Sequence, residues 1–259
     1  MSKFTFIRAQ TESGRSTKWG DNFREQQVKI TCNCTKRAFS ETKSANDSYT
    51  KQNTMKTFCM TKQFPKAILV GMTKGGTTAL MDFLKAHPLL SPRYIRPDTR
   101  YFNHYYEKPY DWYRNLMPCS YHNQITISKS TEYFFTPGIA EKIRKFDPSM
   151  KILIMVREPI DRAMSQYVMW KHQAKFRIGN ASFEEAVTTG RNKEIDKDSR
   201  LIIVSNYQRH MKAWIDNFSL KQILIIDGLN FVKNPADELN KLEDFLGVDR
   251  YFTPDSFVL

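Results

Sequence analysis

Residues 67–78 read Ala-Ile-Leu-Val-Gly-Met-Thr-Lys-Gly-Gly-Thr-Thr, and this stretch carries the strongest indication of the fold class. Its first five residues form a short, branched apolar run that ends in glycine, which is typical of a strand buried in a parallel sheet. Residues 77–87 then carry apolar side chains at helical spacing until Pro88, so a helix is predicted directly after the strand. A strand that leads at once into a helix is the opening unit of an α/β fold.

The alternation continues along the chain. Apolar runs predict three further strands, at residues 124–128, 151–156 and 222–227. Helix-start signals and apolar spacing predict helices at residues 137–146, 159–171, 199–218 and 235–246, and a short helix that begins at a Ser182–Glu185 capping box. We therefore expect an α/β fold in which a P-loop-like parallel sheet is flanked by helices on both faces.

The first 63 residues differ from the rest in composition. They hold 12 Lys and Arg against 5 Asp and Glu, are rich in small polar residues, and show no sustained apolar period. We predict a basic, largely flexible N-terminal arm over residues 1–63 and a folded domain over residues 64–259. The chain contains neither a signal-peptide core nor a run of about 18 apolar residues, so as given it is expected to be soluble.

The chain as a whole is strongly basic. It has 40 Lys and Arg against 27 Asp and Glu, a net charge of +13 at pH 7 and a pI near 9.5. Such a charge favours nucleic acid, an anionic membrane or a sulfated polysaccharide as partner, although a merely soluble basic protein can have the same composition. The four cysteines lack the spacing of a zinc site, and no disulfide pattern can be read from them.

The loop after the first strand has the character of a phosphate site. Gly75 and Gly76 let the backbone turn tightly, Lys74 adds a positive charge, and Thr77 and Thr78 can cap the following helix or bond phosphate oxygens. A Walker A loop places its lysine after the last glycine, whereas here the lysine comes first. An ordinary strand-to-helix turn remains an alternative for this segment alone.

A second phosphate anchor follows the strongest strand signal. Arg157 closes that strand, and Ser165 lies eight residues later, just over two helical turns away on nearly the same helix face. An arginine fork at the mouth of a strand and a hydroxyl above it can clamp a phosphate. Together, the two anchors describe a nucleotide with phosphates at both ends, although Arg157 and Ser165 alone would more often have capping or surface roles.

This pair of anchors resembles the signature of the sulfotransferases. Residues 70–77 are similar to heparan sulfate glucosamine 3-O-sulfotransferases in particular, as are residues 106–108, 112–115, 124–126, 129–134 and 222–228. The likeness covers about residues 64–248. The N-sulfotransferase domain of heparan sulfate N-deacetylase/N-sulfotransferases is a close second, because it shares Gly-Thr-Thr-Ala-Leu and Lys129-Ser130.

The resemblance implies a sulfotransferase fold and a direct in-line transfer, without metal, from the donor 3′-phosphoadenylyl sulfate (PAPS) to heparan sulfate or a related acidic polysaccharide. It implies neither nucleic acid nor another protein as partner, and the Golgi lumen as location. The donor-binding residues that it implies are Lys74, Gly75, Gly76, Thr77, Thr78, Arg157 and Ser165.

The resemblance also assigns the catalytic and acceptor-binding positions. Asp98 matches the glutamate that serves as general base, Lys74 would neutralise charge on the leaving oxygen, and Lys129 would contact donor and sugar. The acceptor-binding residues that it implies are Arg100, Lys129, Ser130, Thr131 and Glu132.

Several positions depart from the family pattern. Asp98 is one methylene shorter than the usual glutamate, Arg100 stands where histidine is usual, and Thr78 replaces an arginine. The chain stops before a cysteine-bridged hairpin and a Lys-Gly-Arg segment that the family carries. Two other classes of function therefore stay open: a P-loop nucleotide kinase, for which Asp227 is the only magnesium-binding candidate by position, and a non-catalytic nucleotide- or polyanion-binding relative.

Overall fold

The computed structural model describes residues 32, 34–39, 54–93, 97–173 and 179–257. By its internal contacts the chain separates into residues 1–31 and residues 32–259, and all described residues belong to the second unit. Within the described residues, no helix combines the length and the apolar character needed to cross a membrane.

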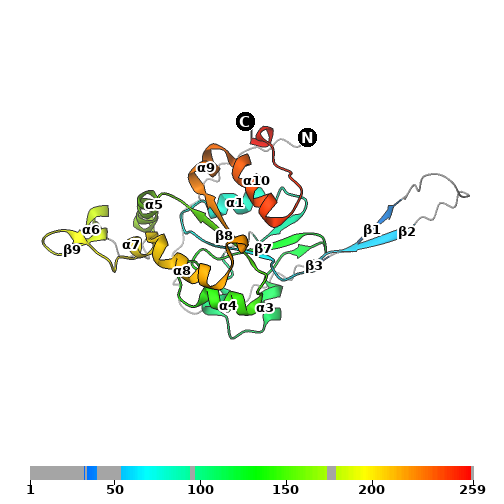
Figure 1. Ribbon diagram of the computed structural model, residues 1–259, viewed down its shortest axis with the longest axis horizontal. Helices are drawn as coiled ribbons and strands as arrows, with labels where there is room; N and C mark the ends of the chain where they lie inside the picture. Colours follow the sequence, from blue (N-terminus) through cyan, green and yellow to red (C-terminus); the bar gives the residue numbers. More distant parts are fainter. Residues whose placement is uncertain (1–31, 33, 40–53, 94–96, 174–178, 258–259) are drawn as a thin grey trace, which may run out of the picture. The chain divides into compact units, whose positions relative to one another are not determined.

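A five-stranded parallel sheet forms the centre of this unit (Figure 1). Its strands lie in the order β11-β8-β4-β7-β5, so the first of them along the chain occupies the middle. They are β4 (Ala67–Gly71), β5 (Leu90–Pro92), β7 (Ile125–Lys129), β8 (Lys151–Val156) and β11 (Ile223–Asp227). Every residue of β4 is buried, as expected of a strand covered on both faces.

Alternate side chains of β4 enter two separate cores. Ile68 and Val70 pack in a cluster with side chains of α4 (Ile139–Phe146) and α8 (Tyr207–Asn217). Ala67 and Leu69 pack in another, with side chains of α1 (Thr77–Leu84), α9 (Gly228–Lys233) and α10 (Pro235–Leu246). The prediction of a parallel sheet with helices on both faces is therefore confirmed.

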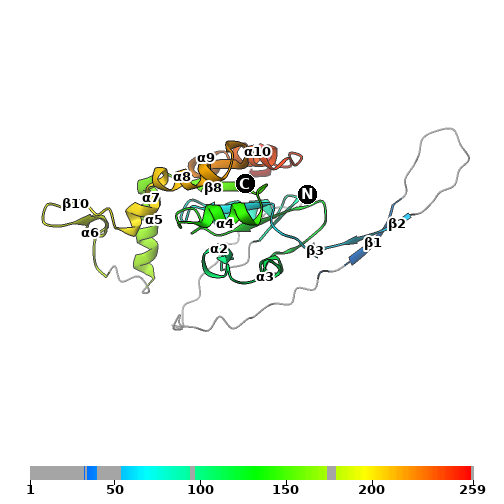
Figure 2. The same ribbon diagram turned by 60° about the horizontal axis from the view of Figure 1, so that its bottom comes forward.

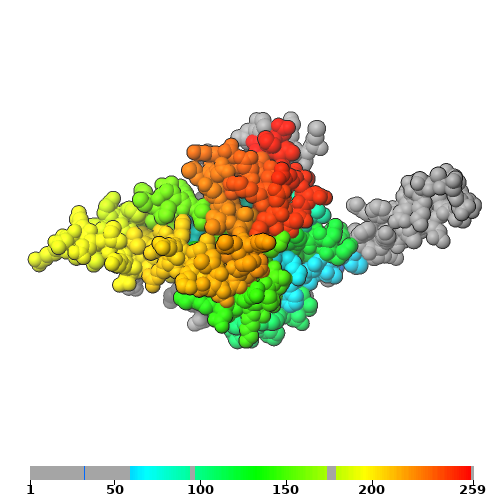
Figure 3. All heavy atoms as spheres, in the orientation of Figure 1, coloured from blue at the N-terminus to red at the C-terminus, as the bar shows by residue number. Residues whose placement is uncertain are grey.

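The figures show the same two layers. Helices α1, α9 and α10 gather on one side of the sheet, and α4 lies on the opposite side with α3 (Tyr110–Asn115) (Figures 1 and 2). In the space-filling view, the orange and red atoms of α9, α10 and the residues after them form one continuous surface (Figure 3).

The remaining elements are short except for α5, which has 14 residues. The predicted capping box is present: Ser182 accepts from the Glu185 N–H and the Glu185 side chain accepts from the Ser182 N–H, at the start of α6. The remaining elements, apart from those of the N-terminal region described below, are α2 (Tyr101–His104), α5 (Pro159–His172), α6 (Phe183–Val187), α7 (Arg200–Ser205), the strands β9 (Thr188–Thr189) and β10 (Glu194–Ile195), and the 3-10 helices η1 (Leu220–Gln222) and η2 (Pro254–Phe257).

Several helix boundaries differ from prediction, and α1 ends at Leu84, three residues before the expected end. The single helix expected over residues 199–218 is two helices, because Asn206 leaves helical geometry at ψ 78° and its side chain accepts from the Arg209 N–H as the cap of α8. Helix α4 begins at Ile139 instead of Pro137, because Gly138 sits before it with φ at 76°, in the left-handed region.

Part of the predicted arm forms strands. β1 (Cys34–Phe39) pairs antiparallel with β2 (Thr54–Cys59) in a register that places Cys34 opposite Cys59, and β3 (Thr61–Lys62) pairs with β6 (Cys119–Ser120). Most of residues 1–63 lies outside the described residues, so the predicted boundary between arm and domain stays a prediction.

The cysteines have a structural role that their spacing did not reveal. A disulfide joins Cys32 to Cys119, 87 residues apart in sequence, and Cys59 is also disulfide-bonded. Such a pairing depends on the three-dimensional fold, because the spacing of cysteines along a chain does not specify connectivity.

Candidate active site

The candidate site lies where the central strands end. β4 has β7 on one side and β8 on the other, and the chain leaves the carboxyl end of β4 into the loop before α1. In open α/β sheets, the crevice outside the carboxyl ends of the strands is where ligands bind. The four positions that the sequence singled out lie at or after the carboxyl ends of strands of this sheet. Lys74 follows β4, Asp98 follows β5, Lys129 ends β7 and Arg157 follows β8.

The phosphate-type loop is held tightly against β8. The Met72 N–H donates to the Met155 carbonyl at 2.8 Å, and the Gly75 N–H donates to the Met72 carbonyl at 2.9 Å. A Cβ on Gly75 would lie only 2.6 Å from the Met155 carbonyl oxygen, and Gly76 has φ at 103°. Both glycines are therefore required by the fold, and the half-buried Lys74 also has a left-handed φ of 71°.

The expected role of the two threonines as helix caps is wrong. Gly76 occupies the cap position of α1 and no side chain caps this helix; Thr77 is buried in its first turn and Thr78 is exposed. Because the first N–H groups of a helix lack intrahelical partners, this turn still presents donors to a ligand.

The second predicted anchor contains an acidic residue that sequence reasoning missed. Arg157 Nη2 lies 3.7 Å from Asp161 Oδ2, and both side chains are about half exposed. Ser165 is half-buried one turn further along α5. The spacing of four residues between Arg157, Asp161 and Ser165 was visible in the sequence and was the signal that could have found Asp161.

Asp98, Lys129 and Thr131 are brought together. Asp98 Oδ2 accepts from the Thr131 N–H at 2.9 Å and from its hydroxyl at 3.0 Å, while Lys129 Nζ lies 3.3 Å from Asp98 Oδ1. The side chains of Asp98 and Lys129 are only 18% and 11% exposed, so this ion pair is shielded from solvent. The carboxylate is thus oriented by the loop that follows β7.

The backbone around Asp98 is fixed by its neighbours. The Thr99 N–H donates to the Lys129 carbonyl, and the Tyr133 hydroxyl accepts from the Phe102 N–H at 3.1 Å. Burial raises the pKa of Tyr133 to about 12, so its hydroxyl stays protonated. Ser130 is fully buried, and its N–H donates to the Leu69 carbonyl, which ties this loop to β4.

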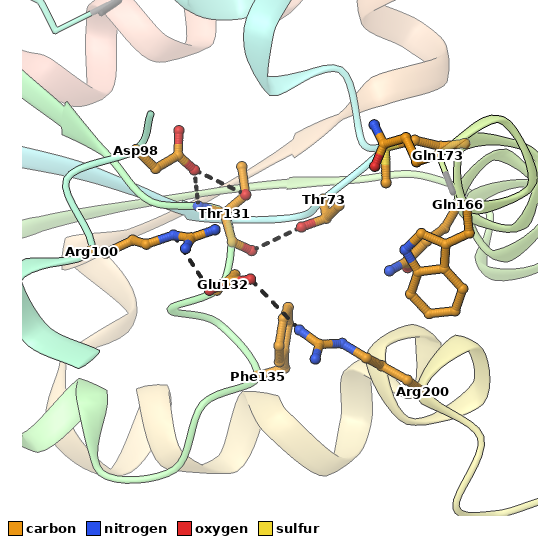
Figure 4. A pocket seen from close by; sticks show the side chains of 11 residues that line it. Thr73, Asp98, Arg100, Thr131, Glu132, Phe135, Gln166, Gln173 and Arg200 are labelled. Atoms are coloured by element: carbon orange, nitrogen blue, oxygen red, sulfur yellow. Dashed lines mark hydrogen bonds and ion pairs between the residues drawn. The ribbon is translucent and has the colours of Figure 1, made fainter. Parts of the chain in front are cut away.

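A pocket of about 210 Å³ opens beside this cluster (Figure 4). Asp98 lines it, and Glu132 lies between the guanidinium groups of Arg100 and Arg200, at 3.8 and 3.6 Å. The sequence predicted Asp98, Arg100, Thr131 and Glu132 for the site. Its other lining residues were missed: Thr73, Phe135, Gln166, Met169, Trp170, Gln173 and Arg200.

The helix α5 supplies most of the missed residues. Gln166 and Trp170 are four residues apart, as are Met169 and Gln173, the residue that directly follows the helix. This spacing puts the four side chains on one side of the helix. This periodicity, in the same helix as Ser165, was a usable signal. Arg200 had none, because α7 reaches the pocket only through the tertiary fold.

A buried arginine supports the pocket from behind. Arg162 is completely buried and donates to the Ser205 hydroxyl at 2.8 Å, to the Leu201 carbonyl at 2.9 Å, to the Gln166 side chain and to the Thr73 carbonyl. Burial lowers its pKa to about 10, so it is still charged at neutral pH. It connects α5, α7 and the end of β4.

Comparison with known proteins agrees with this geometry. The family model for the sulfotransferase domain matches residues 64–253. Heparan sulfate glucosamine 3-O-sulfotransferase 3A1 of Mus musculus is 36% identical over 197 residues, which cover 76% of this chain and 49% of that protein. For heparan sulfate glucosamine 3-O-sulfotransferase 5 of Mus musculus, identity is 36% over 193 residues, with 73% of this chain and 55% of that protein covered.

The fold has a counterpart among solved structures. The crystal structure of a sulfotransferase from Alicyclobacillus acidocaldarius matches with a TM-score of 0.63 and 24% identity, over 76% of this chain and 86% of that one. The chain spans about half the length of the curated relatives that it matches. With a family model matched over most of its length, this chain belongs to the sulfotransferase domain family.

Proposed function

We propose that this chain transfers a sulfuryl group from PAPS to a glucosaminyl residue of heparan sulfate, at the 3-O position. The observation that carries the proposal is the shielded cluster of Asp98, Lys129 and Thr131 beside a glycine loop at the carboxyl edge of the sheet. Identity of 36% to proteins named heparan sulfate glucosamine 3-O-sulfotransferases supports the choice of acceptor.

The donor fits the loop that follows β4. PAPS supplies an activated sulfuryl group on its 5′-phosphate. Lys74, Gly76 and the first turn of α1 with Thr77 and Thr78 would hold that end, because the first N–H groups of a helix lack intrahelical partners. Gly75, whose own N–H donates to the Met72 carbonyl, would let the loop approach the phosphate closely. Arg157 and Ser165 would hold the 3′-phosphate at the start of α5.

On the acceptor side, the chain offers a base and an adjacent cation. Asp98 would accept the proton of the acceptor hydroxyl, since Thr131 already fixes its carboxylate at the pocket wall. Lys129 lies 3.3 Å from this carboxylate and is positioned to stabilise negative charge that develops between donor and acceptor. Arg100, Thr131 and Glu132 line the pocket and would form the acceptor side of the cleft, while the buried Ser130 would support it from behind.

The disulfides bear on location. Disulfides persist in oxidising compartments and are rare in the cytosol. The bond between Cys32 and Cys119 therefore supports maturation in the secretory route, and with it the Golgi lumen as the place of action.

Donor binding is tested by calorimetry with adenosine 3′,5′-bisphosphate. We expect Lys74→Ala and Arg157→Ala each to weaken binding by about 1.5–3 kcal/mol, the contribution of a charged hydrogen bond. Lys233→Ala removes an exposed charge in α9 and serves as the control. Wild-type affinity in both loop variants would contradict the assignment of the two anchors.

Transfer itself is measured with radiolabelled PAPS and a panel of selectively desulfated heparan sulfates, followed by identification of the modified position. Label on the glucosamine 3-hydroxyl is the expected outcome. Label on the amino group would replace the proposal by N-sulfation. Nucleotide binding without any transfer would identify the chain as a non-catalytic relative.

A further inference from the structure

Two arginines from separate parts of the chain face one carboxylate at the pocket. Arg100 immediately precedes α2, Arg200 is the first residue of α7, and Glu132 follows β7. Arg100 Nε lies 3.8 Å from Glu132 Oε2, and Arg200 Nη2 lies 3.6 Å from Glu132 Oε1 (Figure 4). All three residues line the pocket that also contains Asp98.

Among the described residues, these contacts engage few of the guanidinium donors. Both distances exceed that of a hydrogen bond, and the arginine side chains are 46% and 55% exposed. Each guanidinium has several N–H donors, and one loose ion pair engages few of them. Within the described residues, Arg100 and Arg200 have no second carboxylate at ion-pair distance. Exposed ion pairs of this kind contribute little and exchange partners readily.

The surroundings hold Arg200 at the pocket. Its guanidinium carbon lies 5.7 Å from the centre of the Phe135 ring, and Phe135 lines the same pocket. A cation over an aromatic face keeps its charge and its in-plane N–H groups available for an anion. Glu132 is also contacted by the Asn103 amide at 3.5 Å, so the carboxylate has another partner when an arginine leaves it.

We propose that Arg100 and Arg200 form a subsite for an anionic substituent of the acceptor, a sulfate or carboxylate on the sugar, and that Glu132 is the resident counter-ion with which this substituent competes. The inference rests on the proposed function and deepens it, because it requires an acidic group on the acceptor. The separation between this group and the reacting hydroxyl must match the separation between the arginine pair and Asp98. Glu132 then lowers affinity for acidic acceptors instead of contributing a contact.

The direction in which two substitutions change the affinity for the acceptor distinguishes this arrangement from a direct contact between Glu132 and the acceptor. Arg200→Gln should weaken binding of a heparan sulfate hexasaccharide about 5- to 10-fold, because a charge-assisted hydrogen bond is lost. Glu132→Gln should strengthen it about 2- to 5-fold, because the competing negative charge is removed. The uncharged control is the same hexasaccharide after desulfation and reduction of its carboxyl groups to alcohols. Its affinity for each variant should lie within about twofold of its affinity for wild type, because only a charge-dependent contact has changed.

Binding is measured by calorimetry in the presence of adenosine 3′,5′-bisphosphate, so no turnover is needed. Arg209→Gln removes an exposed charge from the neighbouring helix α8 and is the matched control. The subsite is refuted if Arg200→Gln binds the acidic hexasaccharide like wild type, or if Glu132→Gln loses affinity as Arg200→Gln does. Failure of the proposed function would show differently, as wild-type protein that binds neither nucleotide nor hexasaccharide.

Discussion

Asp98 has both of its carboxylate oxygens engaged, one by Thr131 and the other by Lys129. The resemblance that points to this residue as base expects glutamate, whose carboxylate would extend one methylene further. The shorter aspartate therefore depends on the loop after β7 to hold it at the pocket wall. A displacement of about 1 Å at a catalytic group can lower the rate on the order of 100-fold, so this orientation matters.

Substitutions at Asp98 test that dependence. We expect Asp98→Asn to abolish nearly all sulfate transfer while leaving nucleotide affinity unchanged, because the amide keeps the shape of the side chain but cannot accept the proton. Asp98→Glu should retain activity, because the resemblance has glutamate at this position and Asp98 lines the pocket. Both variants are assayed with radiolabelled PAPS and by nucleotide titration.

Two other results would change this view. Full activity in Asp98→Asn would make Asp98 a structural residue and move the search for the base to Glu132, which lines the same pocket. Loss of activity in Asp98→Glu, with folding intact, would show that the local backbone has adapted to aspartate.

At the level of elements, a buried cation bridges α5 and α7, which also pack through Ala163, Tyr167 and Leu201. Arg162 in α5 bonds Leu201 and Ser205 in α7 and also reaches the Thr73 carbonyl at the end of β4. No carboxylate within the described residues pairs with it. The guanidinium is therefore stabilised by neutral acceptors alone.

Arg162→Met should destabilise the protein by about 2–4 kcal/mol, because it leaves these buried acceptors without donors. Urea unfolding followed by circular dichroism measures the change, with Arg209→Met in α8 as a surface control. Because burying a charge is itself costly, an unchanged or increased stability would show that desolvation of Arg162 outweighs its hydrogen bonds.

The elements that the sequence predicted well are those with a strong local signal. The strand β4 is an uninterrupted apolar run, β8 is apolar from Ile152 to Val156, and α10 begins at the predicted Pro235. Helices α2 and α3 were missed because they are only four and six residues long and bury aromatic residues without a clear period. The break at Asn206 was missed because a single residue causes it: the Asn206 side chain caps the next helix, and the apolar pattern on either side is unchanged.

The candidate site divides along similar lines. Lys74, Arg157 and Ser165 belong to short motifs, and the resemblance located Asp98 and Lys129. Arg200, by contrast, comes to the pocket from a helix about 70 residues after Glu132, and the Cys32–Cys119 bond spans 87 residues. Contacts of this range depend on how the elements pack, which local patterns do not report.

For the whole unit, the disulfide between Cys32 and Cys119 ties the start of the described chain to β6. A cross-link that closes a long loop stabilises mainly by restricting the unfolded chain, typically by about 2–4 kcal/mol. The double variant Cys32→Ser/Cys119→Ser should therefore unfold at a lower urea concentration than wild type, with its nucleotide affinity unchanged. An identical midpoint would show that the sheet and helices alone determine the stability.

The central position of β4 in the sheet constrains how the chain folds as it is synthesised. β4 is the first of the five strands to leave the ribosome, yet its two neighbours, β7 and β8, follow roughly 60 and 80 residues later. Translation proceeds at about 5–20 residues per second, so both edges of this apolar strand remain unpaired for several seconds. We expect nascent chains stalled before residue 150 to be digested by protease and chains extended past residue 246 to be protected, because only the longer chains contain both strands that pair with β4.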